Sequence, residues 1–251
     1  MNKQVHLLNG DALLARFPKT INGEQLICRE CFVEGPVKSK MLADFFKQRS
    51  IYLNQLYGEF IEHDYKSHVA DEFYDLIRFA EDNNSLILWF EDDLFCQVNL
   101  WFSLSLLFSV ARTEHIYLVR PPVHSPYGFG GLSNKELESC YDLKIMLTEL
   151  PLWNQLWTHF QEQAIPNLLH VAQKLSLTYP FVLPAVGAYI DSIPQKGYIG
   201  RPKERLKEII LELKTRSFGP VFQVFCERES IYGYGDLMVK RLFDELMKEL
   251  K

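Results

Sequence analysis

Three consecutive acids follow a short apolar segment near the middle of the chain. Ser85–Phe90 is apolar, and Glu91, Asp92 and Asp93 end it before a helical pattern begins at Leu94. Acidic groups beside a buried strand are costly unless a cation or water meets them. Carboxylate oxygens are the ligands that Mg²⁺ and Mn²⁺ prefer, and a bound ion can polarise a phosphoryl group. The cluster therefore predicts a site for one of these ions.

Polar residues also follow the other segments that we expect to be strands. Asp11 comes after Val5–Leu8, and Arg120 comes after His115–Val119. In parallel α/β sheets ligands bind at the carboxyl ends of the strands, so we expect these side chains to converge with the acidic cluster. The predicted catalytic and metal-binding residues are Asp11, Glu91 and Asp93. The predicted substrate-binding residues are Asn9, Gly10, Arg29, Glu34, Gln97, Arg120 and His124.

The substrate-binding residues have separate expected roles. Arg29 and Arg120 would neutralise substrate charge. Gln97 lies four residues after Asp93, on the same helix face, and would orient a ligand or water. His124 lies in a loop rich in Pro and Gly, and its ordinary pKa near neutrality suits an acid or base.

The turn Asn9-Gly10-Asp11 allows two interpretations. A glycine before a helix N-terminus exposes backbone N–H groups that bind phosphate. This turn lacks the further glycines of the dinucleotide motif and the lysine of the P-loop, so a plain tight turn is the competing interpretation.

A structural interpretation of the acids also stays open. Asp11 and Asp93 would then cap helix N-termini, and Glu91 would pair with Arg29 or Arg120.

Strand and helix patterns alternate through the first half of the chain. Short segments of β-favouring residues alternate with segments whose apolar residues recur at helical intervals. This order predicts an α/β fold over residues 1–132, a Rossmann-like three-layer domain with a mainly parallel sheet. The expected strands are Val5–Leu8, Gln25–Val33, Ser85–Phe90 and His115–Val119. The expected helices are Ala12–Phe17, Val37–His63, His68–Asp82 and Leu94–Ala111.

Only helices are expected after Lys135. Ser133 and Glu136 fit a capping box that begins the first of them. Residues 133–251 are predicted to form a helical region that ends in a helix-turn-helix-like unit. The expected helices are Glu136–Leu147, Pro151–Gln163, Ile165–Leu175, Phe181–Ile193, Pro202–Lys214, Pro220–Glu229 and Leu237–Leu250.

Composition and charge limit the kinds of partner and the location that we expect for the protein. A formal charge of −5 provides no global positive field for a polyanion, so nucleic acid is not an expected partner. The most apolar stretch, Leu94–Val110, is interrupted by polar residues and is too short to span a membrane. The start of the chain has no secretion-signal pattern, and five cysteines are an odd number for a disulfide framework, so we expect a cytoplasmic protein.

Several fragments together resemble the domain-of-unknown-function family 1835, a bacterial family. They are LLNGDAL at Leu7–Leu13, RECFVEGP at Arg29–Pro36, LWFEDDLFCQVNL at Leu88–Leu100 and GFGGLSNKEL at Gly128–Leu137. The Gly-Tyr-Gly-Asp turn at Gly233–Asp236 is similar to a tail that follows this domain in relatives. Members often carry His where this chain has Asp92, so the resemblance assigns that position no role. It implies a fold and a two-part chain, but no substrate.

Two functions of different classes follow. The first is a divalent-metal-dependent enzyme, or a former enzyme, acting on a nucleotide or other phosphorylated small molecule at the sheet edge. The alternative is a non-enzymatic regulatory or adaptor protein, whose α/β domain senses a ligand and whose helical tail binds protein or nucleic acid. The sequence predicts no oligomeric state.

Overall fold

A five-stranded sheet organises the first part of the chain. The computed structural model describes residues 3–60, 63–110, 115–122 and 127–249. The strand order is β2-β1-β3-β4-β5, in which the first four strands are parallel and β5 runs antiparallel to β4. The strands are β1 (Gln4–Asn9), β2 (Glu24–Cys28), β3 (Ser85–Trp89), β4 (Ile116–Val119) and β5 (Ile145–Met146).

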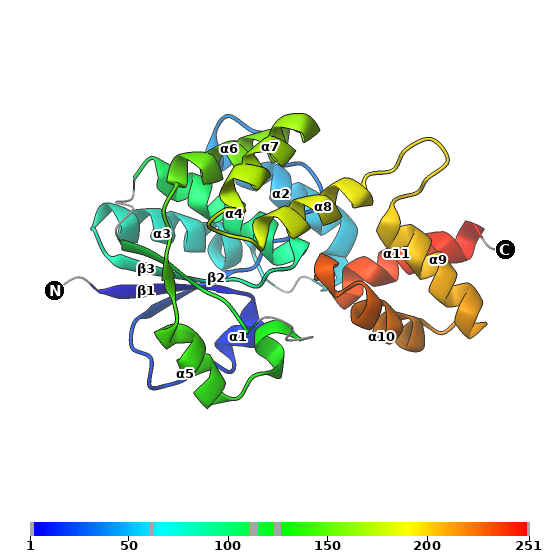
Figure 1. Cartoon of the computed structure of the whole chain (residues 1–251), viewed down its shortest axis with the longest axis horizontal. Coiled ribbons are helices and arrows are strands. Elements are labelled where there is room, and N and C mark those ends of the chain that lie inside the picture. Colours follow the sequence, from blue (N-terminus) through cyan, green and yellow to red (C-terminus); the bar gives the residue numbers. More distant parts are fainter. Residues whose placement is uncertain (1–2, 61–62, 111–114, 123–126, 250–251) are drawn as a thin grey trace.

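Helices cover both faces of this sheet. Along β3, Leu86 and Leu88 belong to one core while Ile87 and Trp89 belong to the other, because successive strand residues point to opposite faces. In Figure 1 one face is covered by α2 (Leu42–Tyr57), α3 (Asp71–Glu81) and α4 (Leu94–Phe108), and the other by α1 (Asp11–Leu14) and α5 (Asn134–Asp142). The predicted α/β class with a mainly parallel sheet is thereby confirmed.

Three further helices pack outside α4. They are α6 (Leu150–Glu162), α7 (Ile165–Leu175) and α8 (Val182–Ser192), each in contact with the next, with α6 and α8 also against α4. Short helical turns join the longer elements: η1 (Gly58–Phe60), η2 (Lys66–Ala70), η4 (Gly128–Gly131) and η5 (Ser230–Tyr232).

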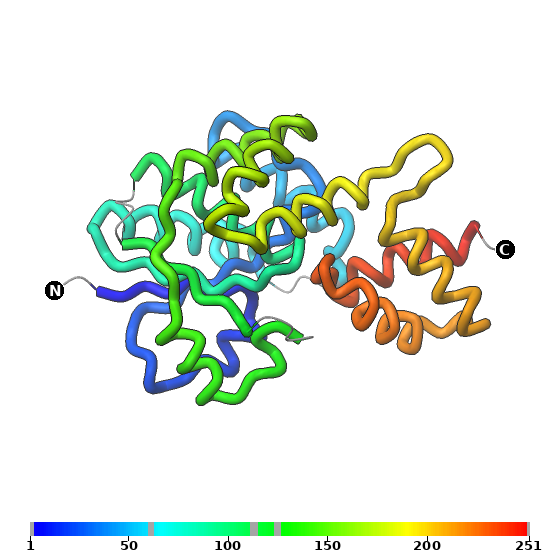
Figure 2. Tube along the Cα trace, viewed as in Figure 1, coloured from blue at the N-terminus to red at the C-terminus, as the bar shows by residue number. Residues whose placement is uncertain are grey.

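The last three helices form a unit with a core of its own. They are α9 (Arg201–Leu213), α10 (Phe218–Arg228) and α11 (Asp236–Glu249), and we call them the C-terminal unit. Figure 2 shows that the chain enters this unit from α8 through a single extended loop. η5 and Gly233 to Gly235 connect α10 to α11, and Tyr232 of η5 inserts into the core of the α/β part. One tyrosine thus anchors the turn of the C-terminal unit to the body of the protein.

Two sequence expectations about strands are wrong. β2 ends at Cys28 and does not continue to Val33, because the residues after it leave the ladder and form ion pairs. A strand also follows Lys135: β5 pairs two exposed residues with β4, and α5 stops at Asp142. Two exposed residues carry no hydrophobic period, so the sequence pattern had no signal for this strand.

The expected boundary at residue 132 does not coincide with a division of the core. Leu147, Trp153 and Tyr189 all belong to the same hydrophobic cluster as Val5 and Leu88 of the sheet. The cluster on the other face of the sheet also crosses residue 132, and among the described residues the cluster in α9 to α11 is the one that contains no residue of the sheet. The predicted capping box at Ser133 and Glu136 is confirmed. The helix that it begins, α5, packs against the sheet and is not part of a separate helical region.

The described residues include no helix long and apolar enough to cross a bilayer. The apolar helix α4 is instead enclosed, with its residues packed between the sheet and α6.

A buried ion pair holds the segment that follows β2. Glu30 and Arg49 of α2 have no exposed side-chain surface, and Arg49 donates to both carboxylate oxygens, at 3.2 and 2.7 Å. Tyr65 also donates to Glu30, and Arg49 donates to the main-chain oxygen of Cys31 at 3.0 Å. These contacts satisfy the buried charges and position the chain beside the sheet edge.

Removal of one charge from this pair should be costly. We expect Glu30→Gln to lower the free energy of unfolding by about 3 kcal/mol or more, because Arg49 would keep a buried charge without its counter-ion. Urea unfolding followed by circular dichroism measures the loss. Asp75→Asn, which breaks an exposed pair with Arg78, should cost about 0.5 kcal/mol or less. Equal losses in the two variants would contradict the assignment.

Candidate metal and ligand site

The acidic cluster lies at the point where the strand order reverses. β2 and β3 lie on opposite sides of β1, so the carboxyl ends of β1 and β3 flank a topological switch point, where doubly wound sheets bind ligands. Asn9 ends β1, and Glu91 comes two residues after β3. The fold thus brings the two stretches together at its most favourable position for a ligand.

Asp93 begins α4. Its Oδ1 accepts a hydrogen bond from Cys96 N at 2.9 Å, which makes it the N-cap of the helix. The prediction that Asp93 caps a helix is therefore confirmed. The cap uses one of its two carboxylate oxygens.

Glu91 accepts hydrogen bonds from a backbone N–H group and from a side-chain amide. Its Oε1 accepts a hydrogen bond from Phe129 N at 2.7 Å, and its main-chain oxygen accepts one from Gln97 Nε2 at 2.8 Å. It pairs with neither Arg29 nor Arg120, whose salt bridges go to other acids. The predicted pairing of Glu91 with an arginine is therefore wrong.

Two glycines from distant segments press against these acids. Gly128 has φ +51° and Gly233 has φ +62°, a region that favours glycine. A Cβ on Gly128 would overlap the Glu91 carboxylate, and a Cβ on Gly233 would overlap that of Asp93. The glycine-rich turns Gly128–Gly131 and Gly233–Asp236 are thus needed for close approach to the acidic cluster.

Cys96 completes a group that sequence analysis missed. The ligand atoms of Glu91, Asp93 and Cys96 all lie within 4.8 Å of one another. The available signal was the spacing, because residues three apart on a helix share a face. Asn9 Nδ2 donates to Cys96 Sγ at 2.9 Å, so the end of β1 contacts this group through its amide.

Electrostatics favour the neutral forms of these side chains. Burial, and then the charge of Asp93, raises the pKa of Glu91 to about 7. Burial also raises the pKa of Asp93, against the opposing effect of its hydrogen bonds to Cys96. Burial and the two carboxylates raise the pKa of the Cys96 thiol well above its usual value. A cation between these groups would reverse the preference.

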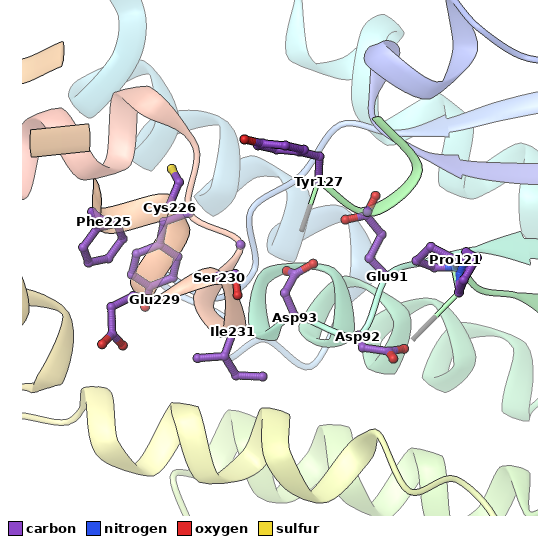
Figure 3. A pocket seen from close by; sticks show the side chains of 14 residues that line it. Glu91, Asp92, Asp93, Pro121, Tyr127, Phe225, Cys226, Glu229, Ser230 and Ile231 are labelled. Carbon is purple, nitrogen blue, oxygen red and sulfur yellow. The ribbon is translucent and has the colours of Figure 1, made fainter. Parts of the chain in front are cut away.

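A cavity of about 420 Å³ opens beside the acids. Figure 3 shows Glu91 and Asp93 pointing to the same side while Asp92 points away. The opposite wall comes from α10 and η5 of the C-terminal unit, and includes Cys226 and Glu229. The aromatic and apolar lining includes Pro121, Pro122, Tyr127, Phe225, Ile231 and Tyr234. Among the described residues that line the cavity there is no Lys, Arg or His.

The two arginines expected to neutralise substrate charge are already paired. Arg29 binds Asp11 and Glu72, each at 2.9 Å. Arg120 makes a two-pronged contact with Asp92, with Nε 2.6 Å from Oδ1, and stacks on Phe181. Asp11 is therefore a partner of Arg29 and is not a member of the Glu91, Asp93 and Cys96 group.

The remaining predicted residues occupy varied positions. Glu34 is not a member of the Glu91, Asp93 and Cys96 group, and it binds Arg241 of α11 and the Tyr57 hydroxyl. Gln97 contacts Glu91, as its helical spacing implied. Gly10 has φ +93° and open space around its α-carbon, with no side chain capping α1. The prediction for His124 lies outside the described residues.

Comparison of the chain with protein-family models, with characterised proteins and with solved structures found no significant match.

The raised pKa of Glu91 should appear in the pH dependence of stability. Between pH 4.5 and about 7 the folded protein keeps a proton that the unfolded chain releases, so the free energy of unfolding falls as pH rises through this window. We expect the stability of Glu91→Gln, relative to wild type, to increase by about 1–3 kcal/mol from pH 4.5 to 8. Chemical unfolding at a series of pH values measures it.

Glu136→Gln is the matched control for this titration. Hydrogen bonds from Ser133 lower the pKa of Glu136 below 4.5, so this group is ionised in both states over most of the window, and the stability of Glu136→Gln relative to wild type should stay nearly constant from pH 4.5 to 8. A flat difference between Glu91→Gln and wild type would contradict the prediction.

The close approach of Gly233 predicts a second effect. Gly233→Ala should cost at least about 1 kcal/mol more than Gly197→Ala, because both residues have positive φ but only Gly233 contacts another group there. Thermal or urea unfolding of the two variants decides, and equal losses would show that Gly233 and Asp93 are not in contact.

Proposed function

We propose that the protein is a divalent-cation-dependent enzyme that acts on a nucleotide or another phosphorylated small molecule. The ion would lie between Glu91 and Asp93, and the substrate would occupy the adjacent cavity. The observation that carries the proposal is the shared orientation of two carboxyl groups at the switch point of the sheet, in a cavity whose described lining contains no basic side chain.

A cation resolves the electrostatic problem of the site. Burial is the main reason why the pKa values of both carboxyl groups are raised, and the charge of Asp93 raises that of Glu91 further. Backbone N–H groups that compensate this charge include Cys96 N and Phe129 N. A divalent ion would compensate the rest and stabilise both ionised forms.

The same ion would have to neutralise substrate phosphate. Arg29 and Arg120 are engaged with acids, so neither supplies an unpaired charge to the cavity. A cation that bridges protein carboxylates and a phosphoryl group both attracts the substrate and polarises it for attack. The cavity volume of about 420 Å³ lies in the range of small-molecule sites, and the aromatic residues Tyr127 and Tyr234 line it.

We also propose membership of family 1835, a Rossmann-like sheet and a bacterial, cytoplasmic setting. The fragments that carry the resemblance supply Asn9, Glu91, Asp93 and Gly128, which lie around this one site. The strand order β2-β1-β3-β4 supports a Rossmann-like topology. All five cysteines are free thiols, which supports a reducing compartment.

One observation favours the alternative function, a ligand-sensing adaptor. The C-terminal unit has its own core and supplies one wall of the cavity, so a ligand that touches both walls would stabilise their association. In that case the ligand would act by fixing the position of the helices, without a reaction.

Titration calorimetry with Mn²⁺ tests the proposal. Wild type should bind one ion, and Glu91→Gln or Asp93→Asn should weaken binding by more than about tenfold, because each variant loses a charged ligand. Glu229→Gln is the matched control: this acid lines the same cavity, but Arg201 and Arg205 already compensate its charge. Its affinity for Mn²⁺ should change by less than about threefold.

Melting temperatures separate the two functions. A nucleotide that raises the melting temperature only with Mn²⁺ present, and not in Glu91→Gln, supports the enzyme. A shift with nucleotide or DNA that needs neither Mn²⁺ nor Glu91 supports the adaptor. Failure of wild type to bind Mn²⁺, Zn²⁺ and Co²⁺ alike would overturn the metal-dependent enzyme.

A further inference from the structure

We propose that Cys96 is the third protein ligand of the ion, and that the site therefore selects a thiophilic ion of the Zn²⁺ or Co²⁺ type over Mg²⁺. This inference rests on the proposed function in one respect, that an ion binds between Glu91 and Asp93. It changes the kind of ion expected, because Mg²⁺ takes oxygen ligands whereas Zn²⁺ binds carboxylate oxygen and thiolate sulfur alike.

The distances suit a single ion. The ligand atoms of Glu91, Asp93 and Cys96 lie within 4.8 Å of one another. The ligand atoms of a tetrahedral ion, each about 2.0–2.3 Å from it, lie about 3.3–3.8 Å apart, so side-chain shifts of up to about 1 Å complete the geometry. Asp93 caps α4 through Cys96 N, and this contact holds two of the three side chains together before any ion arrives. Ligation replaces the thiol proton, which leaves to solvent.

The sulfur has an oriented donor in its outer shell. Asn9 Nδ2 lies 2.9 Å from Cys96 Sγ, and Asn99 fixes the Asn9 amide by donating to its Oδ1 at 3.1 Å. Asn99 is itself held by Phe32 N, at 3.2 Å, and by the main-chain oxygen of Glu30, at 2.7 Å. Thiolate ligands of metals are stabilised by such N–H donors, whose orientation tunes affinity.

An unpartnered buried group gives independent support. Gln97 has no exposed surface, and its Oε1 has no hydrogen-bond partner among the described residues. Its Nε2 donates to the main-chain oxygen of Glu91 at 2.8 Å, so the amide lies against the cluster. A buried amide oxygen without a partner is costly. Three protein ligands leave a tetrahedral ion one open position, and a water held there would offer Gln97 a donor.

The other thiols do not share this environment. Cys96 belongs to the one group of potential ligand atoms found within the described residues, and Cys226 lines the same cavity without belonging to it. A buried cysteine usually acts as a small apolar residue. The two acids and the directed amide distinguish Cys96 from that case.

Co²⁺ is the probe that reports sulfur ligation directly. Wild type titrated with Co²⁺ should develop a thiolate-to-metal charge-transfer band in the near ultraviolet that saturates at one ion per chain. Cys96→Ser should lose the band and bind Co²⁺ more than about tenfold more weakly. Cys226→Ser is the matched control and should keep the band. Zn²⁺ should displace Co²⁺ from wild type, whereas Mg²⁺ in large excess should not.

The outcomes separate this inference from the proposed function. If Co²⁺, Zn²⁺ and Mn²⁺ all fail to bind, the metal site itself is wrong. If Co²⁺ binds without the band, or if Cys96→Ser keeps the band, an ion binds there but Cys96 is not its ligand. Asn9→Ala keeps the thiol and covers the case in which Cys96→Ser does not fold. It should shift the band and weaken binding by about tenfold, and an unchanged band and affinity would count against the inference.

Discussion

The cost of taking carboxyl groups out of water governs this structure. Glu91 and Asp93 follow β3, in which every residue after Ser85 is buried, and burial raises the pKa of both side chains. Each receives a backbone hydrogen bond, and each is approached by a glycine that has no Cβ to obstruct it. These contacts compensate part of the charge and leave a site that a cation fits. The roles that we propose for the cavity, the switch point and the thiol of Cys96 all depend on this incompletely compensated negative charge.

The C-terminal unit participates in the same arrangement although it has a separate core. Its turn brings Gly233 against Asp93, and Tyr232 inserts into the α/β part. Arg241 of α11 binds Glu34, which also accepts a hydrogen bond from Tyr57. The unit is thus attached by the apolar contacts of Tyr232 and by ion pairs, which include that of Arg201 in α9 with Asp191 of α8. Between Glu91 to Asp93 on one side and α10 on the other it leaves the space in which a ligand would touch both parts.

Most helices and strands could be predicted from the spacing of apolar residues in the sequence. The pairing of β5 with β4 and the partners of the arginines could not. The four parallel strands and their crossover helices were expected, and so was the capping box at Ser133. β5 was missed because its two residues are exposed. In the site, Glu91, Asp93 and Gln97 were expected together, but Arg29 and Arg120 bind nearer acids. An arginine pairs with the acid that lies nearest to it in the folded protein. That distance cannot be read from the positions of the two residues in the sequence.

The sequence by itself determined that acids end the third strand, that a helix begins beside them and that glycines recur in two later turns. It determined these because strand and helix periods, capping residues and turn residues are local properties. Only the tertiary structure decided which of these groups meet. It brought Gly128, Gly233 and Asn9 to Glu91, Asp93 and Cys96, and it separated Asp11 and Glu34 from them. Contacts between distant segments follow from packing of the whole chain, since each ion pair forms where folding places its partners.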